Sequence, residues 1–166
     1  MFGDHLLCCP RNNFTQRHSA VQEAICNILT ASAQPHAREA TIPGATASLR
    51  PADILLRSFE NGHDVAVDLT VCHGWQTSES TAAPSRERWR SFLVRKEKAK
   101  HAKYDEACST AGLGFRAMAF GTWGGQGPEG AQLLARLVKR AAAWADGPDQ
   151  ALRTGETRRM VGLSLM

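Results

Sequence analysis

Two aspartates stand in two neighbouring strand-like segments of the chain. Asp53 lies in "LRPADILL" (49–56) and Asp68 in "DVAVDLTVC" (64–72), and the link "RSFENGH" contains an Asn-Gly pair. Asn-Gly is the strongest short-range signal for a two-residue hairpin turn. Two carboxylates brought together on one face of a hairpin can bind a divalent cation such as Mg²⁺, which prefers oxygen ligands.

A type I′ turn at Asn-Gly predicts the register of this hairpin. Leu55 would face Asp68 and Asp53 would face Thr70, so both aspartates would share one face, diagonal to each other at roughly 7 Å between backbones. The opposite face would be the core face. It would carry one polar residue, Ser58, among Ala52, Ile54, Leu56, Val65, Val67, Leu69 and Val71.

Two carboxylates held close without a partner repel, so a divalent metal is their natural neutraliser. A simpler alternative is a pair of solvent-facing aspartates at a sheet edge. A basic segment further along the chain bears on this choice. "RERWRSFLVRKEKAKHAK" (86–103) contains eight Lys or Arg and two acids, and it opens a helix predicted to run from 86 to 110.

On a helical wheel of this segment, Trp89, Phe92, Leu93 and Ala107 form one stripe, and Lys96, Lys100 and Lys103 fall in the same arc. We expect the first two turns to pack on the sheet and the later turns to direct Lys100 or Lys103 towards the aspartates. Such a lysine could orient a water or stabilise charge on a phosphate. The alternative is that the lysines snorkel outwards. Tyr104, the only tyrosine, flanks this face.

A first helix, predicted to begin near Thr15, carries His18 on the same stripe as Val21 and Ile25. His18 could contact a phosphate or a water near the site. A capping or core-edge role is the alternative.

The composition fits one ordinary globular domain. The chain has 166 residues, 43% hydrophobic and 22% charged, with a net charge of +4. The mild basic excess is compatible with a nucleic-acid partner. No apolar run is long enough to cross a membrane, and the N-terminus has no secretory signal, so we expect a nuclear or cytoplasmic protein that is not secreted.

The element order is helix, hairpin, helix, strand, helix, which predicts an α/β domain with a mixed sheet. We place the domain at 15–145, after an irregular segment 1–14 and before a flexible tail 146–166.

Five segments in a fixed order carry a resemblance: "RHSAV", "RPADILL", "VDLTV", "KHAKY" and "GTWGG". With them the chain resembles the restriction-like endonuclease domain at the C-terminal end of some non-LTR retrotransposon reverse transcriptases, in the PD-(D/E)XK nuclease superfamily. The resemblance covers about Asp4 to Ala145. It implies a PD-(D/E)XK-like fold, in which a mixed central sheet with a β-hairpin core is flanked by helices.

The resemblance implies that Asp53 and Asp68 bind Mg²⁺ or Mn²⁺ and that the domain cleaves a DNA phosphodiester, releasing a 3′ end that primes reverse transcription. The superfamily usually places its lysine two residues after the second acid, where this chain has Thr70. The retroelement branch takes a lysine from the following helix in a K-x-x-K-Y pattern, which Lys100, Lys103 and Tyr104 match. Basic side chains at the start of that helix are the candidates for DNA binding: Arg86, Arg88, Arg90, Arg95 and Lys96.

The same domain usually follows a zinc knuckle, and "DHLLCC" supplies only its second half, with His5 and either Cys8 or Cys9 as ligands. Two ligands do not hold a structural zinc, so zinc is expected only if residues upstream complete the knuckle. The chain is therefore expected to be a piece or remnant of a larger reverse transcriptase polyprotein, although it carries no polymerase motif. Two functions follow: a Mg²⁺-dependent endonuclease, or a catalytically inactive remnant that binds nucleic acid. A resolvase-like nuclease ranks below both.

Overall fold

The computed structural model describes residues 14–42, 52–72, 86–122 and 125–145. These ranges contain three helices and four strands. In chain order they are α2 (Phe14–Ala31), β1 (His36–Arg38), β2 (Ile54–Glu60), β3 (His63–Cys72), α3 (Arg86–Thr110), β4 (Gly114–Gly121) and α4 (Pro128–Ala145). None of the described helices combines the length and the apolar composition that a membrane span requires.

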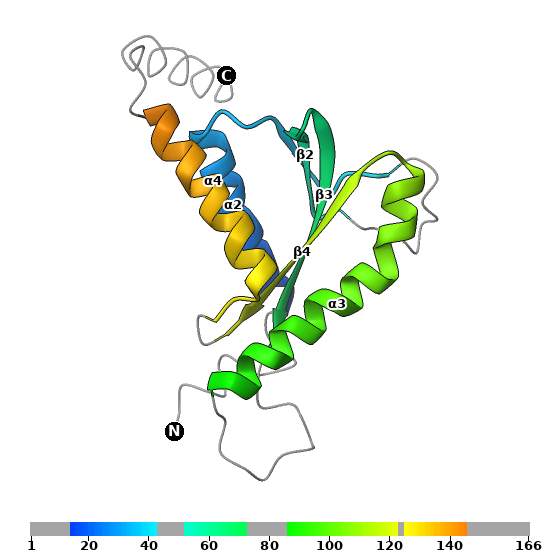
Figure 1. Ribbon diagram of the computed structural model, residues 1–166. Coiled ribbons are helices and arrows are strands. Elements are labelled where there is room, and N and C mark those ends of the chain that lie inside the picture. Colours follow the sequence, from blue (N-terminus) through cyan, green and yellow to red (C-terminus); the bar gives the residue numbers. More distant parts are fainter. Residues whose placement is uncertain (1–13, 43–51, 73–85, 123–124, 146–166) are drawn as a thin grey trace.

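The four strands form one mixed sheet in the order β1-β2-β3-β4. β1, β2 and β3 pair in antiparallel fashion, and β4 pairs in parallel with β3 after the α3 crossover. Helices cover both faces: α2 and α4 lie side by side on one, and α3 crosses the other (Figure 1). The α/β class and the mixed sheet predicted from the sequence are therefore confirmed.

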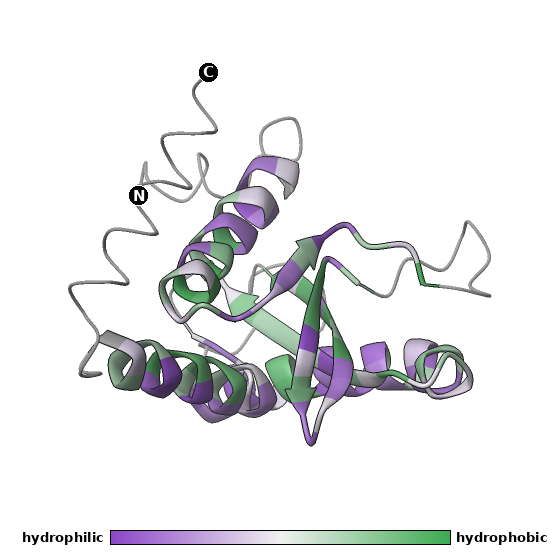
Figure 2. Cartoon of the chain, turned by 90° about the horizontal axis from the view of Figure 1, so that it is seen from above, coloured by the Kyte–Doolittle hydropathy of each residue, from purple (hydrophilic) through white to green (hydrophobic). Residues whose placement is uncertain are grey.

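Two main cores fill the space between these layers. The first joins α2 and α4 to the sheet through residues such as Leu29, Leu56 and Leu137, all at most 1% exposed. The second lies under α3 and contains Leu55, Ala66 and Tyr104. Figure 2 shows green, hydrophobic residues on the strands, interrupted by purple ones, while purple and green residues alternate along the helices. This alternation is typical of helices that bury one side.

Most element boundaries agree with those predicted. The helix predicted over 86–110 is confirmed as α3, and Gly112, with a φ of 71°, lies just beyond its end. The structure adds one short strand to the predicted order, β1, before the hairpin. The predicted irregular segment 1–14, apart from its last residue, and the predicted tail 146–166 lie outside the described residues.

The predicted register of the hairpin is wrong. Leu55 pairs with Ala66, and not with Asp68, although the turn itself pairs Glu60 with His63 as a two-residue turn requires. Ile54 pairs with Val67, so Asp53, which directly precedes Ile54, faces Asp68 and not Thr70.

The cause of this difference is a two-residue bulge in β2. Between Leu56–Val65 and Glu60–His63, β2 has three residues (57–59) and β3 has one, so β2 has two extra residues. Ser58 adopts a left-handed conformation with a φ of 47°, and its backbone N–H donates to Asp64 Oδ1 at 2.8 Å. Asp64 Oδ2 also accepts a 2.7 Å hydrogen bond from Arg57. Since the bulge adds two residues, it leaves the alternation of faces beyond it intact.

The bulge also changes which residues near the turn are buried. Phe59 enters the α2/α4 core in the place predicted for Ser58, which is exposed. Ala52, predicted for that same core, packs under α3 instead. The packing of α3 extends past its first turns, because Tyr104 and Cys108 near its C-terminal end are buried as well. The face of the sheet that carries Asp68 is thus covered by α3.

Candidate active site

Asp53 lies at a bend directly before β2 and is held by contacts from three other segments. Its carbonyl oxygen accepts hydrogen bonds from the Glu39 backbone N–H at 2.9 Å and from Gln22 Nε2 at 2.7 Å. Its carboxylate Oδ2 accepts a 2.6 Å hydrogen bond from the Leu69 backbone N–H. His18 Nε2 of α2 lies 3.1 Å from the same oxygen. The residue is therefore fixed at both its backbone and its carboxylate.

Asp68 lies in the middle of β3 and is only 4% exposed. Lys100 of α3 places its Nζ atom 2.7 Å from Asp68 Oδ2, and the Lys100 side chain is 29% exposed. Burial raises the pKa of the Asp68 carboxyl group, and the hydrogen bond and charge of Lys100 oppose that rise without cancelling it. The negative charge of Asp53 raises this pKa further, and the hydrogen bond from the Leu69 backbone N–H to Asp53 Oδ2 places the Asp53 carboxylate beside the residue that follows Asp68.

The two candidate lysines occupy different environments. Lys100 is half-buried against Asp68, whereas Lys103 is exposed and its Nζ lies 4.7 Å from the centroid of the Tyr104 ring. The hydrogen bond and charge of Tyr104 raise the pKa of Lys103. Tyr104 itself is buried against Phe115, with ring centroids 5.6 Å apart. The structure thus brings Lys100 into direct contact with Asp68, whereas Lys103 feels the charge of Asp68 from further away. The exposed positions of Lys96 and Lys103 agree with the snorkelling alternative.

Thr70 shares the face of β3 that carries Asp68, because it is two residues further along the strand. Its hydroxyl oxygen is buried and has no hydrogen-bond partner in the part of the chain that the structure describes. A buried hydroxyl without a partner is unfavourable by about 1–3 kcal/mol. A water or a ligand next to the carboxylates would relieve this cost.

The side chains of Asp53, Asp68 and Thr70 can offer a metal only oxygen donors. Among the described residues, no three His, Cys, Asp or Glu side chains gather as a metal site. Mg²⁺ commonly takes only one or two carboxylates, with waters and phosphate oxygens filling its other positions. Asp53, Asp68 and the buried Thr70 hydroxyl therefore fit Mg²⁺ or Mn²⁺ in donor type. A metal here would share Asp68 with Lys100.

One part of the site was missed from the sequence. Gln22 of α2 is only 5% exposed. Its Nε2 donates to the Asp53 carbonyl and to Glu39 Oε1, and its Oε1 accepts a 3.4 Å hydrogen bond from Arg38. Gln22 therefore links Asp53 to Arg38 in β1 and to Glu39 directly after it. Gln22 follows His18 by one helical turn, and this spacing was the available signal. Glu39 adopts a left-handed φ of 48°, which no sequence pattern indicated.

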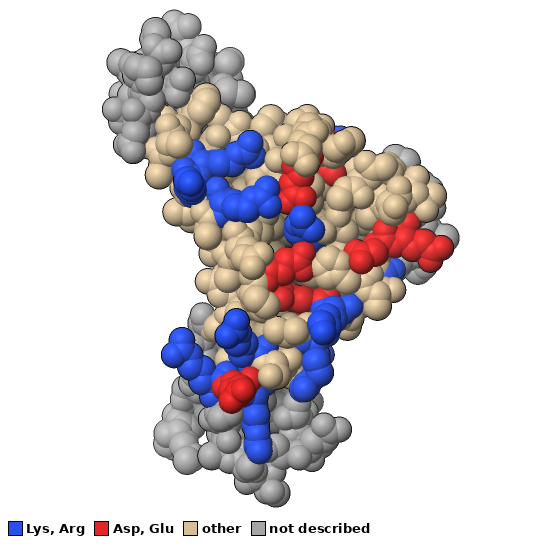
Figure 3. Space-filling model, viewed as in Figure 1, with Lys and Arg blue, Asp and Glu red and all other residues tan. Residues whose placement is uncertain are grey.

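The predicted DNA-binding side chains lie on the first turns of α3. Figure 3 shows a basic area over this part of the helix. Trp89 stacks on Phe92 with centroids 5.3 Å apart, and Lys96 Nζ lies 5.2 Å from the Phe92 centroid. All five predicted residues are exposed: Arg86, Arg88, Arg90, Arg95 and Lys96. The predicted zinc ligands His5, Cys8 and Cys9 lie outside the described residues.

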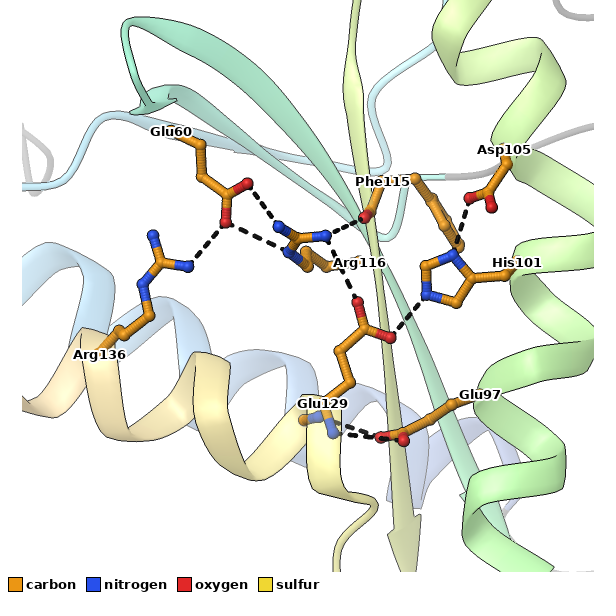
Figure 4. Close-up of polar contacts among 9 residues, drawn as sticks. Glu60, Glu97, His101, Asp105, Phe115, Arg116, Glu129 and Arg136 are labelled. Atoms are coloured by element: carbon orange, nitrogen blue, oxygen red, sulfur yellow. Dashed lines mark hydrogen bonds and ion pairs between the residues drawn. The ribbon is translucent and has the colours of Figure 1, made fainter.

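A second polar network, which the sequence did not predict, connects α3, β4 and α4 (Figure 4). His101 of α3 contacts Asp105 Oδ1 at 2.8 Å and Glu129 Oε2 at 2.6 Å. Burial alone would lower the pKa of His101, but its hydrogen bonds to these two carboxylates raise it overall. Glu129 also lies 3.7 Å from Arg116, which binds Glu60 at 2.7 Å.

Glu97 of α3 completes this network from a buried position. Its carboxylate accepts hydrogen bonds from the backbone N–H groups of Glu129 and Gly130, at 3.3 and 3.0 Å, in the first turn of α4. Carboxylates stabilise helix N-termini in this way. A Cβ atom at Gly127 would collide with Glu97. The contact therefore holds α3 close to the start of α4.

In comparisons with known proteins, no family model, curated protein or solved structure matches this chain. The resemblance to the retroelement nuclease domain therefore depends on the ordered motifs of the sequence alone.

Proposed function

We propose that this domain is a Mg²⁺- or Mn²⁺-dependent DNA endonuclease of the PD-(D/E)XK type, derived from a retroelement polyprotein. The observation that carries the proposal is the 2.7 Å contact between Lys100 and Asp68, next to which the Leu69 backbone N–H holds the carboxylate of Asp53. The sequence places these three residues in three segments, and the fold brings together the two acids and the lysine that such a nuclease needs. A DNA substrate agrees with a nuclear or cytoplasmic location.

Asp53 and Asp68 would hold the metal in this proposal. A bound Mg²⁺ would polarise the phosphate and lower the pKa of the attacking water. Water forms a bond to phosphorus, the P–O3′ bond breaks, and O3′ takes a proton to leave the 3′-hydroxyl that a primer requires. Lys100 would orient that water or stabilise the negative charge that develops on the phosphate. The exposed basic side chains at the start of α3 would contact the DNA backbone.

Lys100 occupies the role that the superfamily usually gives to a lysine at the position of Thr70. A lysine on α3 can take this role because α3 covers the face of β3 that carries Asp68. Thr70 instead lies two residues beyond Asp68 on the same face of β3, and its hydroxyl oxygen is buried. His18 is the second auxiliary group, since its Nε2 atom is 3.1 Å from Asp53 Oδ2 and holds the orientation of that carboxylate.

One observation favours the second candidate, a non-catalytic domain that binds nucleic acid. Asp68 is already paired with Lys100, and Asp53 already accepts a hydrogen bond from the Leu69 backbone N–H. The acidic pair is thus partly neutralised by the protein itself, and a carboxylate compensated in this way does not need a metal for stability.

Nicking of supercoiled plasmid in Mg²⁺ separates the two candidates. The endonuclease reading expects nicking by the unmodified protein, none by Asp68→Asn, and none by either when EDTA replaces Mg²⁺. Glu23→Gln is the matched control, because Glu23 is an exposed carboxylate on α2. It should nick normally. DNA retained in a gel shift with no nicking in any sample would instead establish the non-catalytic candidate.

A further inference from the structure

An open groove lies between the end of β2 and the C-terminal half of α4, with a volume of about 360 Å³. The groove is lined by Phe59, Arg136, Lys139, Arg140 and Ala143. None of these residues belongs to the site formed by Asp53, Asp68 and Lys100.

The two arginines of the groove are held in fixed positions. Their guanidinium groups lie over the Phe59 ring, with their central carbons 5.0 Å (Arg136) and 4.9 Å (Arg140) from its centroid. Glu60 accepts a 2.8 Å hydrogen bond from Arg136 Nη1, and Gln34 Oε1 accepts one of 2.7 Å from Arg140 Nη1. Each guanidinium carries five N–H donors, so donors remain for a further ligand.

The groove has an excess of positive charge. Three cations occur within five residues, and the stretch "LLARLVKRAAAWA" (133–145) contains no acid. Arg136 and Arg140 are four residues apart, where like charges destabilise a helix by about 0.2–0.5 kcal/mol. Glu60 is the one carboxylate that contacts this trio in the described structure, and it is shared with Arg116. An anion in the groove would relieve the repulsion.

We infer that the groove binds a phosphate of the DNA backbone at a position separate from the site of cleavage, an inference that rests on the DNA-directed function proposed above. A guanidinium held over an aromatic ring presents a planar fork of donors that matches two phosphate oxygens, and Lys139 adds a point charge in the same groove. The ligand class is therefore a phosphodiester.

The surface between the two basic areas of the molecule limits how DNA can lie on it. Figure 3 shows one basic area over α4 and another over the start of α3, with acidic side chains between them. The network of Figure 4 places Glu60 and Glu129 in the region between α4 and α3. Arg116 lies between these two acids and pairs with both, but the acids outnumber it, so a continuous backbone track across them would be disfavoured. The two basic areas therefore contact separate phosphates.

DNA binding measured against salt concentration tests this inference. Fluorescence anisotropy of a labelled duplex in EDTA reports binding without cleavage. Lys139→Gln should weaken binding about threefold to tenfold and reduce the slope of log K against log salt by about 0.9, the loss of one phosphate contact. Lys139→Arg keeps the charge and should behave as the unmodified protein. Lys139 is exposed at the helix surface, so neither change is expected to disturb the fold.

The outcomes distinguish this inference from the proposed function. An unchanged affinity and slope for Lys139→Gln, with plasmid nicking intact, would overturn the groove alone. If Lys139→Gln binds DNA more weakly and Lys139→Arg binds it normally, but no sample nicks plasmid, the phosphate site in the groove would be supported and the endonuclease proposal overturned. A chain that binds no DNA at all would overturn both.

Discussion

The backbone N–H of Leu69 donates a 2.6 Å hydrogen bond to the carboxylate of Asp53. Leu69 directly follows Asp68 in β3, so the strand that carries one acid also orients the other. A displacement of β3 would move both groups together. The acidic pair is therefore organised by the sheet before any ligand arrives, which is how a binding site limits the cost of ordering its groups.

Replacing Lys100 with Met should leave Asp68 buried without its ionic partner. We expect the free energy of unfolding to fall by about 3 kcal/mol near neutral pH and plasmid nicking to be lost. Burial raises the pKa of Asp68 in the folded state. The folded protein thus holds this proton more tightly than the unfolded chain, and stability falls as pH rises from the ordinary carboxyl range through the raised pKa.

The Lys100→Met deficit should accordingly be smallest in acid and grow as pH rises. Urea unfolding at about pH 4 and about pH 8 measures it. Lys98→Met, which removes an exposed charge from the same helix, is the control. Equal stability of Lys100→Met and the unmodified protein at both pH values would show that the pair is unimportant.

Replacing Gln22 with Met keeps the approximate shape of a buried side chain but removes its donors to Asp53 and Glu39. We expect a loss of about 1 kcal/mol in stability, because two hydrogen bonds from Gln22 are lost while the Asp53 carbonyl keeps the Glu39 backbone N–H as a donor. The displaced Asp53 should also raise the Mg²⁺ concentration that gives half-maximal nicking. Gln16→Met, at an exposed position of α2, controls for the change in composition. A stability loss with no change in the Mg²⁺ requirement would exclude a positioning role.

Replacing Glu97 with Ala removes the carboxylate that caps α4. The backbone N–H groups of Glu129 and Gly130 would lose their acceptor, at an expected cost of about 2 kcal/mol in urea unfolding. Glu106→Ala, at an exposed position of α3, should change stability by less than about 0.5 kcal/mol. Similar values for the two variants would refute the capping contact.

Replacing His101 with Gln tests the link between α3 and α4. The contacts with Glu129 and Asp105 raise the pKa of His101 above its ordinary value. The resulting stabilisation is fully present below about pH 6.5 and is lost as pH rises through the raised pKa. His101→Gln should therefore lower stability by about 1–2 kcal/mol at about pH 6 and by less at higher pH.

Unfolding curves across this pH range measure the effect of His101, with His63→Gln at the exposed hairpin tip as control. A constant difference between His101→Gln and the unmodified protein at every pH would contradict the assigned protonation.

Local sequence patterns predicted the elements well and the contacts between them less well. The ends of α3 agree with prediction because a strong helical segment is followed by Gly112. The hairpin register was wrong because the bulge depends on the Asp64 carboxylate reaching the Ser58 backbone, and no periodicity reports such a contact.

The candidate site shows the same limit. A helical wheel placed Lys100 and Lys103 in one arc, and only the position of α3 on the sheet distinguishes them. Gln22 contacts Asp53, which is 31 residues further along the chain. Glu97 contacts the start of α4, which is 32 or more residues away. Contacts of this range follow from tertiary packing, so they were visible only once the elements were in place.

The two-residue bulge of β2 has a consequence for the core of related chains that differ in length at the hairpin tip. Ile54, Leu56 and Phe59 all face the α2/α4 core, although Phe59 follows Leu56 by three residues and strict alternation would turn it to the other side. Removal of the two extra residues would let the strands pair without interruption from Leu56 to the turn, and the single residue left opposite Asp64 would then point to the other face of the sheet. The bulge is therefore what gives Phe59 its inward position, and related chains with a tip two residues shorter should lack an aromatic side chain at this corner of the core.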